Sequence, residues 1–595
     1  MSMAIQNLFE TPLTCSVFYV ALVSLLLGFS KDQQFNENSK SDQEEYDFII
    51  VGGGSAGCVL ANRLSERREW NILLLEAGRE EPVLAEIPGF AFTMRQTDID
   101  WNYRTQPTKF ACIRNKGCVW PRGRVMGGSS TLNYMIYVRG NRDDYDSWAR
   151  MGNLGWSYNE VLPYFKRSED NRDPDIVAQN SNYHSTGGYQ QVQRFNYKDQ
   201  PTKILFKAFL ELGFNETDIN GEHQIGVAHL QATSINGSRV STNRAFIRPI
   251  RESRLNLFVK SESYVTRVLI DPGSKRATGV EYTHIPTGKS VTVYARKEVI
   301  VSSGTVNSPK LLMLSGVGPR DELEKHNIPV IRDLPVGNNL HDHVSFQGLF
   351  VQINPDMVNN PKCEKRINDL THYLTTNDGP LSSTSITSVS AFVRTKYEKR
   401  RELPDIQFQF GNFGVSPYFE VFAILPVLLQ PKSKGFVRLN FTDLIWGDPI
   451  IQPNYFAEDI DVKRMVEGIR IGLELFRTTA FTQNQFQLVM KAMPPCDKIE
   501  YNTDEYWICI IRQYTDTFYH PVGTCKMGPS DDPGAVVDAN LRVYGIQGLR
   551  VIDASIMPIV PRGNTNAPTI MVAEKASDMI KKDWIQTGWW SSIQN

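Results

Sequence analysis

The chain has 595 residues, with 64 Lys and Arg against 65 Asp and Glu, which gives a formal net charge of -1. Hydrophobic residues make up 41% and charged residues 22%, a globular composition that excludes a disordered or collagen-like protein. Near-neutral charge argues against binding of nucleic acid, because phosphate recognition relies on a clustered basic surface. The length predicts several domains, or one large elaborated domain that can enclose a small molecule.

The N-terminus carries one long apolar run, from Cys15 to Phe29, followed by a polar stretch. We expect residues 1–30 to be a signal peptide and 31–45 a polar linker, which predicts a secreted, extracellular protein. The segment before the apolar run has no Lys or Arg and contains Glu10, so an uncleaved anchor is the alternative. Without such an anchor we expect no stable membrane association. Three glycosylation sequons, at Asn215, Asn236 and Asn440, agree with secretion.

Eight cysteines occur in the chain, and Cys15 would leave with the signal peptide. The remaining seven are an odd number, so at least one thiol stays unpaired. Cys112 and Cys118 bracket a short polar loop with a glycine, and we expect them to form a disulfide. Cys58 and Cys525 lie in glycine-rich apolar motifs and are expected to be buried small hydrophobic residues.

The first chemical motif is a glycine-rich turn between a strand and a helix. The apolar run Tyr46–Val51 predicts a buried parallel strand. Of the glycines that follow, Gly52 permits a tight turn, Gly54 lets the backbone approach a pyrophosphate, and Gly57 lets the helix pack on the strand. Ser55 and Ala56 lie in this turn, and we expect the helix itself at Cys58–Ser65, with its N-terminal N–H groups facing the phosphates.

A second buried strand follows at Ile72–Leu75 and ends in Glu76, 19 residues after Gly57. An acidic residue at this distance is placed to accept hydrogen bonds from a ribose diol. Because strand, glycines, helix, second strand and acidic residue occur in order, the segment predicts a Rossmann-like dinucleotide site.

Two further segments carry a family resemblance. Pro121–Gly140, which contains Gly127-Gly-Ser-Ser130, and Gly304–Gly318 resemble the two signatures of the glucose-methanol-choline (GMC) oxidoreductases. The similarity extends from about Asp47 to about Ile580, and the insect glucose dehydrogenase-like branch is the most similar. The resemblance implies FAD as the cofactor.

The resemblance also implies a set of FAD-binding residues. The residue matching Val265 contacts adenine in the family, and Asn133 matches a position near the flavin. The complete set expected to hold FAD consists of Gly52, Gly54, Ser55, Ala56, Gly57, Glu76, Arg124, Val125, Gly127, Gly128, Ser129, Ser130, Asn133, Val265, Tyr519, Asp553, Ala554, Asn564 and Thr565.

His520 is the candidate catalytic base. In the family a second His or Asn follows at a fixed interval, and here Asn564 lies 44 residues after His520. Hydride transfer from an alcohol requires removal of the hydroxyl proton, which a neutral imidazole can accept. The amide of Asn564 can orient the substrate oxygen, and Asn566 is the alternative for that pocket position. His341 and His343 resemble a metal pair, but two ligands without a third are a weak metal signal, so we expect no metal and hydrogen bonding within the fold.

The predicted fold class is α/β, α+β overall: a Rossmann-like FAD-binding domain assembled from separate segments, with a substrate domain built on an antiparallel sheet flanked by helices. We expect residues 46–150, 226–335 and 517–582 in the FAD domain, 151–225 and 336–516 in the substrate domain and insertions, and 583–595 as a tail. Alternation in Ile406–Phe410 and Phe436–Asn440 predicts half-buried strands.

The resemblance implies oxidation of an alcohol or sugar CH–OH group, with electrons passed to a quinone or to oxygen. Because fold does not fix function, a hydroxynitrile lyase that keeps FAD without redox turnover and a non-catalytic flavin-binding protein are the alternatives. The substrate stays open among sugars, sterols and aromatic or allylic alcohols.

Overall fold

The computed structural model describes residues 21–26, 28, 43–357, 363–412, 415, 418–489 and 492–591, with side chains described to residue 585. The predicted signal peptide and the linker lie largely outside the described residues. Within the part of the chain that is described, no helix is both long enough and apolar enough to cross a membrane.

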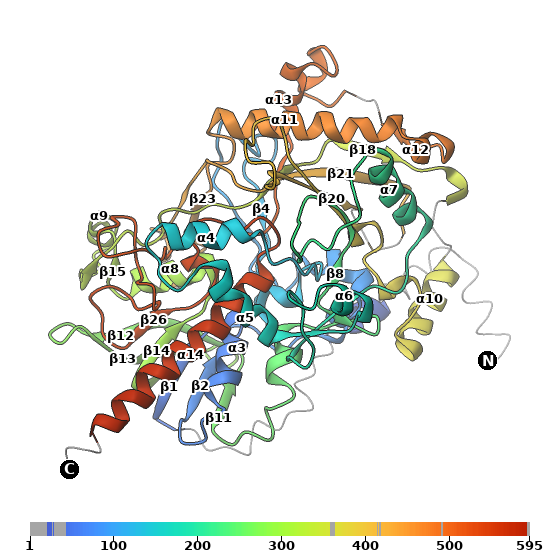
Figure 1. The fold of residues 1–595 in the computed structure, drawn as a ribbon. Helices are drawn as coiled ribbons and strands as arrows, with labels where there is room; N and C mark the ends of the chain where they lie inside the picture. Colours follow the sequence, from blue (N-terminus) through green and yellow to red (C-terminus); the bar gives the residue numbers. More distant parts are fainter. Residues whose placement is uncertain are drawn as a thin grey trace.

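The first sheet has seven strands in the order β11-β2-β1-β14-β13-β12, with β26 paired to the end of β14 (Figure 1). Strands β11, β2, β1, β14 and β26 are parallel, whereas β13 and β12 are antiparallel. All but the first residue of β1 are buried, as expected for a parallel strand covered on both faces. The bounds are β11 Leu257–Lys260, β2 Ile72–Leu75, β1 Glu45–Val51, β14 Lys289–Val301, β13 Arg276–His284, β12 Ser263–Asp271 and β26 Leu549–Val551.

Helices enclose this sheet. Helix α3 (Ser55–Leu64) packs on β1 and β2 and is covered by α14 (Asn566–Ser591), which also contacts α5 (Tyr158–Ser168). Figure 1 shows α14 running beside α3, although the two helices are 500 residues apart in sequence. Helix α8 (Gly304–Leu314) packs on β12. The turn between β1 and α3 therefore lies at the carboxyl edge of the parallel strands, where ligands bind in open α/β sheets.

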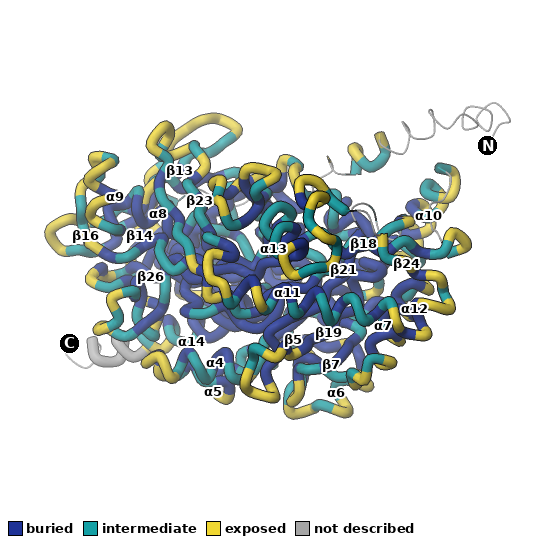
Figure 2. The backbone as a smooth tube through the Cα atoms, turned by 90° about the horizontal axis from the view of Figure 1, so that it is seen from above, coloured by how far each residue is buried: buried dark blue, intermediate teal, exposed yellow. Residues whose placement is uncertain are grey.

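The second sheet has eight strands and is antiparallel, in the order β24-β18-β21-β20-β19-β7, with β17 paired to β21 and β25. Helices α11 (Asp459–Glu474) and α7 (Gln200–Glu211) pack on it. The strands are β24 Gln487–Leu488, β18 Leu349–Gln352, β21 Val421–Leu428, β20 Ile406–Gly411, β19 Val389–Val393, β7 Gly226–His229, β17 Val344–Phe346 and β25 Thr515–Thr517. Viewed from above, buried segments fill the interior and exposed segments lie at the periphery (Figure 2).

The remaining helices lie between and around these layers: α4 Arg142–Arg150, α6 Pro174–Gln179, α9 Arg320–Lys325, α10 Cys363–Thr376, α12 Thr479–Gln483 and α13 Asp504–Gln513. The remaining strands form small sheets: β3 Tyr103–Arg104 with β4 Val119–Trp120, β9 Ser234–Ile235 with β10 Ser238–Arg239, β15 Val317–Gly318 with β16 Arg332–Asp333, β22 Phe436–Arg438 with β23 Ile450–Gln452, and β5 Glu169–Asn171, β6 Gln190–Arg194 and β8 Gln231–Ala232 together. The predicted mixed α/β class, with a mostly parallel first sheet and an antiparallel second sheet, is confirmed.

Some expectations differ from the observed elements. Strand β7 begins at Gly226 and pairs with β19 of the second sheet, whereas the sequence placed residue 226 at the start of an FAD-domain segment. Helix α14 continues past residue 582, into the expected tail. Strand β20 exists as predicted, but residues 406–410 are all buried rather than half-buried. The reason is that the polar face of β20 is turned toward an enclosed cavity and not toward solvent.

The cysteine predictions are confirmed where they concern described residues. Cys112 and Cys118 form a disulfide, and Cys58 and Cys525 are buried thiols. A second disulfide joins Cys496 to Cys509, with Cα atoms 5.9 Å apart. The sequence did not predict it because a loop and the first half of α13 (Asp504–Gln513), rather than a short turn, separate the two residues.

Candidate active site

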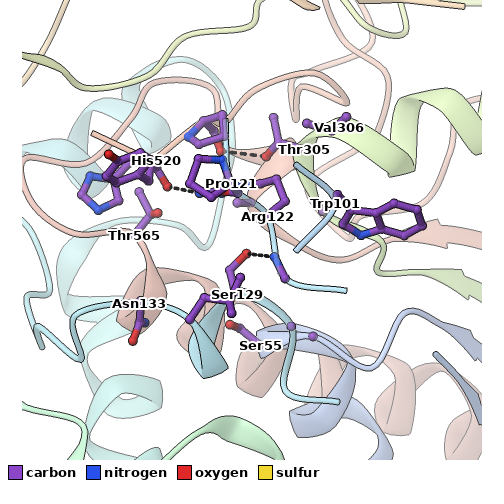
Figure 3. Close-up of a pocket in the computed structure, with 18 of the residues that line it drawn as sticks. Ser55, Trp101, Pro121, Arg122, Ser129, Asn133, Thr305, Val306, His520 and Thr565 are labelled. Carbon is purple, nitrogen blue, oxygen red and sulfur yellow. Dashed lines mark hydrogen bonds between the residues drawn. The ribbon is translucent and has the colours of Figure 1, made fainter. Parts of the chain in front are cut away.

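A deep cavity lies between the carboxyl edge of the first sheet and the second sheet. Its lining comes from the β1–α3 turn, the end of β2, η5 (Gly128–Thr131), β12, the start of α8, β20, β25 and η12 (Ala554–Ile556). Figure 3 shows Ser55, Ser129, Asn133, Thr565 and His520 around this space. Most of the predicted residues line it: Gly52, Gly54, Ser55, Ala56, Glu76, Gly128, Ser129, Asn133, Val265, Tyr519, His520, Asp553, Ala554, Asn564 and Thr565.

The glycines of the first turn are required by backbone contacts. Gly52 has φ +106°, and a Cβ there would lie 2.5 Å from the carbonyl oxygen of Ser302. A Cβ on Gly57 would lie 1.8 Å from the carbonyl oxygen of Gly52. A Cβ on Gly128 would lie 2.7 Å from Cα of Gly54, so the two glycine loops approach each other without side chains. The resulting cradle leaves backbone amides open to a phosphate group.

Glu76 closes the cradle at the end of β2. Its two carboxylate oxygens accept hydrogen bonds from the backbone N–H groups of Gly53, at 2.7 Å, and Gly78, at 2.8 Å. Burial nevertheless raises the pKa of Glu76 to about 7. Each carboxylate oxygen retains a second lone pair, so the group can also accept hydrogen bonds from a ribose diol.

Five predicted FAD residues do not line the cavity and support it from behind. Gly57 packs beneath Gly52, Val125 is fully buried in a hydrophobic cluster, and the Arg124 guanidinium lies over the Trp101 ring at 4.9 Å. The Ser130 hydroxyl donates to the carbonyl of Gly127 at 2.6 Å. Position in a motif indicated proximity to the cavity, but the side chains of Val125 and Ser130 are turned into the protein.

His520 is held at the boundary between the two sheets. Its backbone N–H donates to the Asp342 carboxylate at 2.7 Å. The preceding residue, Tyr519, has φ +67°, and its carbonyl accepts a hydrogen bond from the Arg122 guanidinium at 2.6 Å. These contacts fix the backbone, so the imidazole has little freedom to turn away from the cavity.

Both ring nitrogens of His520 have side-chain partners. Nδ1 lies 2.9 Å from Nδ1 of His343, and Nε2 lies 3.1 Å from Nδ2 of Asn564. Because an amide nitrogen is only a donor, Nε2 of His520 accepts the hydrogen bond from Asn564. The single proton of the neutral ring therefore lies on Nδ1, which donates a hydrogen bond to Nδ1 of His343. Burial, His343 and Arg122 lower the pKa of His520 well below its usual value. The ring is therefore neutral at physiological pH, with the lone pair of Nε2 toward Asn564.

Asn564 is itself positioned by the second sheet. Its Oδ1 accepts from Nε2 of Gln407 in β20, at 3.4 Å. Asn566, the alternative weighed from the sequence, instead accepts from the Ser55 hydroxyl at 2.8 Å, beside the glycine cradle. The two asparagines thus have different neighbours, and the one that contacts His520 is Asn564.

The two histidines of the Asn339–His343 segment have separate roles in the fold. His341 donates from Nδ1 to the carbonyl of Asn339 at 2.8 Å and accepts at Nε2 from the N–H of Val560 at 2.9 Å, which confirms the expected hydrogen bonding within the fold. His343 is the direct neighbour of His520, a contact that the sequence reasoning missed. The signal was present, because an Asn-Leu-His-Asp-His run supplies both Asp342 and His343, but nothing local relates it to residue 520.

Polar side chains also line the part of the cavity beyond His520. The Arg95 guanidinium donates to the Tyr519 hydroxyl at 2.5 Å and lies over the Phe92 ring at 3.8 Å. The Gln347 amide donates to the Asp516 carboxylate at 2.5 Å, and burial raises the pKa of Asp516 to about 6. These polar groups are paired with one another, and aromatic and aliphatic side chains, among them Phe346, Phe410 and Leu425, line the same cavity.

Comparison with known proteins agrees with this geometry. Two family models described as GMC oxidoreductase match residues 46–345 and 431–573. Glucose dehydrogenase [FAD, quinone] of Drosophila melanogaster is 44% identical over 557 residues, which cover 91% of this chain and 87% of the relative. Alcohol dehydrogenase [acceptor] of Pseudomonas putida is 37% identical, over 90% of this chain and 95% of its own.

Solved structures show the same architecture. A formate oxidase variant of Aspergillus oryzae, studied for modification of its FAD, superimposes with a TM-score of 0.81 at 27% identity, over 91% of this chain and 99% of that one. A FAD-dependent oxidoreductase of Chaetomium thermophilum gives a TM-score of 0.80 at 25% identity, over 90% of this chain and 99% of that one.

Proposed function

Since the chain belongs to the GMC oxidoreductase family and is a FAD-dependent oxidoreductase, we propose that it oxidises the CH–OH group of an alcohol or sugar. The observation that carries this proposal is the hydrogen-bonded row His343–His520–Asn564 at the wall of a cavity continuous with the glycine cradle. Such a reaction needs a neutral, buried imidazole whose lone pair can turn to a substrate hydroxyl, and the Nε2 lone pair of His520 is engaged only by the Asn564 amide.

We assign the cradle to FAD. The β1–α3 turn and the start of α3 would hold the pyrophosphate, Glu76 the ribose diol, and Val265 the adenine. Gly128, Ser129 and Asn133 would lie along the flavin and its ribityl chain. The domain assignment follows: the first sheet carries the FAD-binding part, and the second sheet, with β7 included, carries the substrate-binding part.

Each residue of the row has a distinct task. Bound FAD supplies the acceptor for hydride from the substrate carbon. Nε2 of His520 accepts the hydroxyl proton as the hydride leaves, because an alkoxide carbon donates hydride more readily than an alcohol carbon. The Asn564 amide donates to the substrate oxygen and orients it. Nδ1 of His343 accepts a hydrogen bond from the Nδ1–H group of His520, which keeps the proton off Nε2.

Anaerobic flavin reduction tests the proposal. The purified protein is mixed with a panel of sugars, sterols and aromatic alcohols, and the flavin absorbance near 450 nm is followed, at which oxidised flavin absorbs. We expect bleaching by at least one compound, followed by recovery when a quinone or oxygen is added. A FAD-loaded protein that no alcohol bleaches would contradict an oxidoreductase acting on CH–OH donors.

Asn564→Ala separates an orienting role from a role in holding the cofactor. We expect a protein with retained FAD absorbance and slowed reduction, with His372→Ala, on the exposed face of α10, as the control that reduces at the wild-type rate. A colourless Asn564→Ala protein would show that Asn564 mainly holds FAD.

We also propose that the protein is secreted. Asn215 and Asn236 of two sequons are exposed, and the chain contains disulfides, which persist in oxidising compartments. N-terminal sequencing of protein recovered from the medium of expressing cells tests this. A start near residue 31 is expected, and retention of residues 1–30 on cell-bound protein would favour the anchor.

A further inference from the structure

Gln409 in β20 is a buried polar side chain that no described residue satisfies. Its side chain is 1% exposed, and neither Nε2 nor Oε1 has a hydrogen-bond partner among the described residues. Burying an unpaired amide is costly, because both atoms lose their hydrogen bonds to water. Such a group therefore requires an explanation beyond packing.

The position of Gln409 supplies that explanation. It lines the same cavity as His520 and Asn564. Side chains two residues apart on a strand share a face, and Gln407 reaches Asn564 from that face. Gln409 therefore faces the cavity as well, about 7 Å further along the strand, since each residue advances about 3.3 Å.

Other polar groups near this part of the cavity are already paired within the protein. The Ser345 hydroxyl donates to the carbonyl of Pro426 at 2.7 Å, and the Thr387 hydroxyl donates to the carbonyl of Phe410 at 2.9 Å. The Gln347 amide donates to the Asp516 carboxylate. Gln409 differs from these groups because its Nε2 donor and its Oε1 acceptor can both bind a molecule that enters the cavity.

We propose that Gln409 is a specificity-determining residue that binds a second hydroxyl group of the substrate, while His520 and Asn564 engage the hydroxyl that is oxidised. A hydroxyl both donates and accepts, so it can pair with Oε1 and with Nε2 of one amide. A substrate without this hydroxyl leaves the amide buried and unpaired, and the site rejects it for that reason. This inference rests on the proposed oxidation of an alcohol or sugar.

Gln409→Met tests it, because Met has a similar length and volume and no amide. The substrate pairs differ in one hydroxyl: glucose against 2-, 3-, 4- and 6-deoxyglucose, and 1,4-butanediol against 1-butanol. In the wild type we expect kcat/KM for the hydroxylated member of at least one pair to exceed that of its partner by tenfold or more. In Gln409→Met that ratio should fall to near one, through loss on the hydroxylated member alone.

Gln407→Met is the matched control, since it lies on the same strand and face but contacts Asn564. It should lower kcat/KM by a similar factor for both members of every pair, leaving the ratio as in the wild type. The unfolding temperature gives a second readout. Removing an unpaired buried amide should leave it unchanged or raise it in Gln409→Met.

The outcomes separate this inference from the proposed function. If the wild type oxidises members of the panel and Gln409→Met leaves every ratio unchanged, Gln409 does not read a second hydroxyl. A lower unfolding temperature with equal loss on all compounds would give Gln409 a structural role instead. If no member bleaches the wild-type flavin, the proposed function fails first, and the inference fails with it.

Discussion

Replacing His343 by Leu removes the acceptor that lies 2.9 Å from Nδ1 of His520. The N–H group of His520 Nδ1 is then buried without a partner, which costs about 1–3 kcal/mol. The cost favours the other tautomer, in which Nε2 carries the proton and cannot accept one from the substrate. Applied to the barrier for flavin reduction, this cost corresponds to a loss of about 5- to 150-fold in rate.

The matched variant is His343→Asn, whose Oδ1 can accept a hydrogen bond close to where Nδ1 of the imidazole accepts it. We expect it to recover most of the rate that His343→Leu loses. The assay is stopped-flow anaerobic reduction at saturating alcohol, with the FAD content measured for each variant. An unchanged rate in His343→Leu, or equal losses in both variants at full FAD content, would refute the assigned tautomer.

Three further predictions follow from the site and the fold. Because the pKa of His520 is lowered well below 6.5, the imidazole stays unprotonated on acidification. The rate constant of flavin reduction should therefore fall less than threefold from pH 7.5 to 5.5. A base with a pKa of 6.5 would instead lower this rate constant about tenfold. Gly128→Ala should yield protein with little FAD, because its Cβ would collide with Gly54. The control is Gly288→Ala, which also has a positive φ, +66°, but has nothing within 4 Å of the added Cβ, and it should keep the wild-type ratio of flavin to protein absorbance. Equal ratios in the two variants would exclude the collision. Non-reducing peptide mapping should recover the pairs Cys112–Cys118 and Cys496–Cys509. The buried thiols of Cys58 and Cys525 should resist alkylation before denaturation. Free thiols at any of the four paired positions would contradict the assignment.

The glycine cradle was predictable from the sequence because its determinants are local. A buried strand, a glycine turn, a helix and a second strand ending in Glu76 follow one another within about thirty residues. All of these requirements except the Glu76 carboxylate concern the backbone alone. The spacing of His520 and Asn564 was likewise readable, but only through the family resemblance. No local sequence rule predicts that His520 and Asn564, which lie in different segments, contact each other.

The residues that support His520 could not be predicted in the same way. His343 directly precedes β17 and Gln407 lies in β20, so their contacts with His520 and Asn564 depend on how the second sheet packs against the first. The pattern of β20 illustrates the ambiguity. Alternating Gln and Phe predicted a strand with one solvent-exposed polar face. The polar face is present, but it is turned toward the cavity. Period-2 alternation reports two different faces and does not distinguish solvent from an enclosed site.

The central claim is that His520 accepts the hydroxyl proton while the substrate carbon gives up hydride. The most direct test compares the anaerobic reduction rate constants of the wild type and of His520→Ala, at equal FAD content and with an alcohol that the wild type oxidises. A general base contributes about 10²–10⁴-fold, so the variant should reduce its flavin at least a hundredfold more slowly. Flavin that bleaches as fast in His520→Ala as in the wild type would contradict the account.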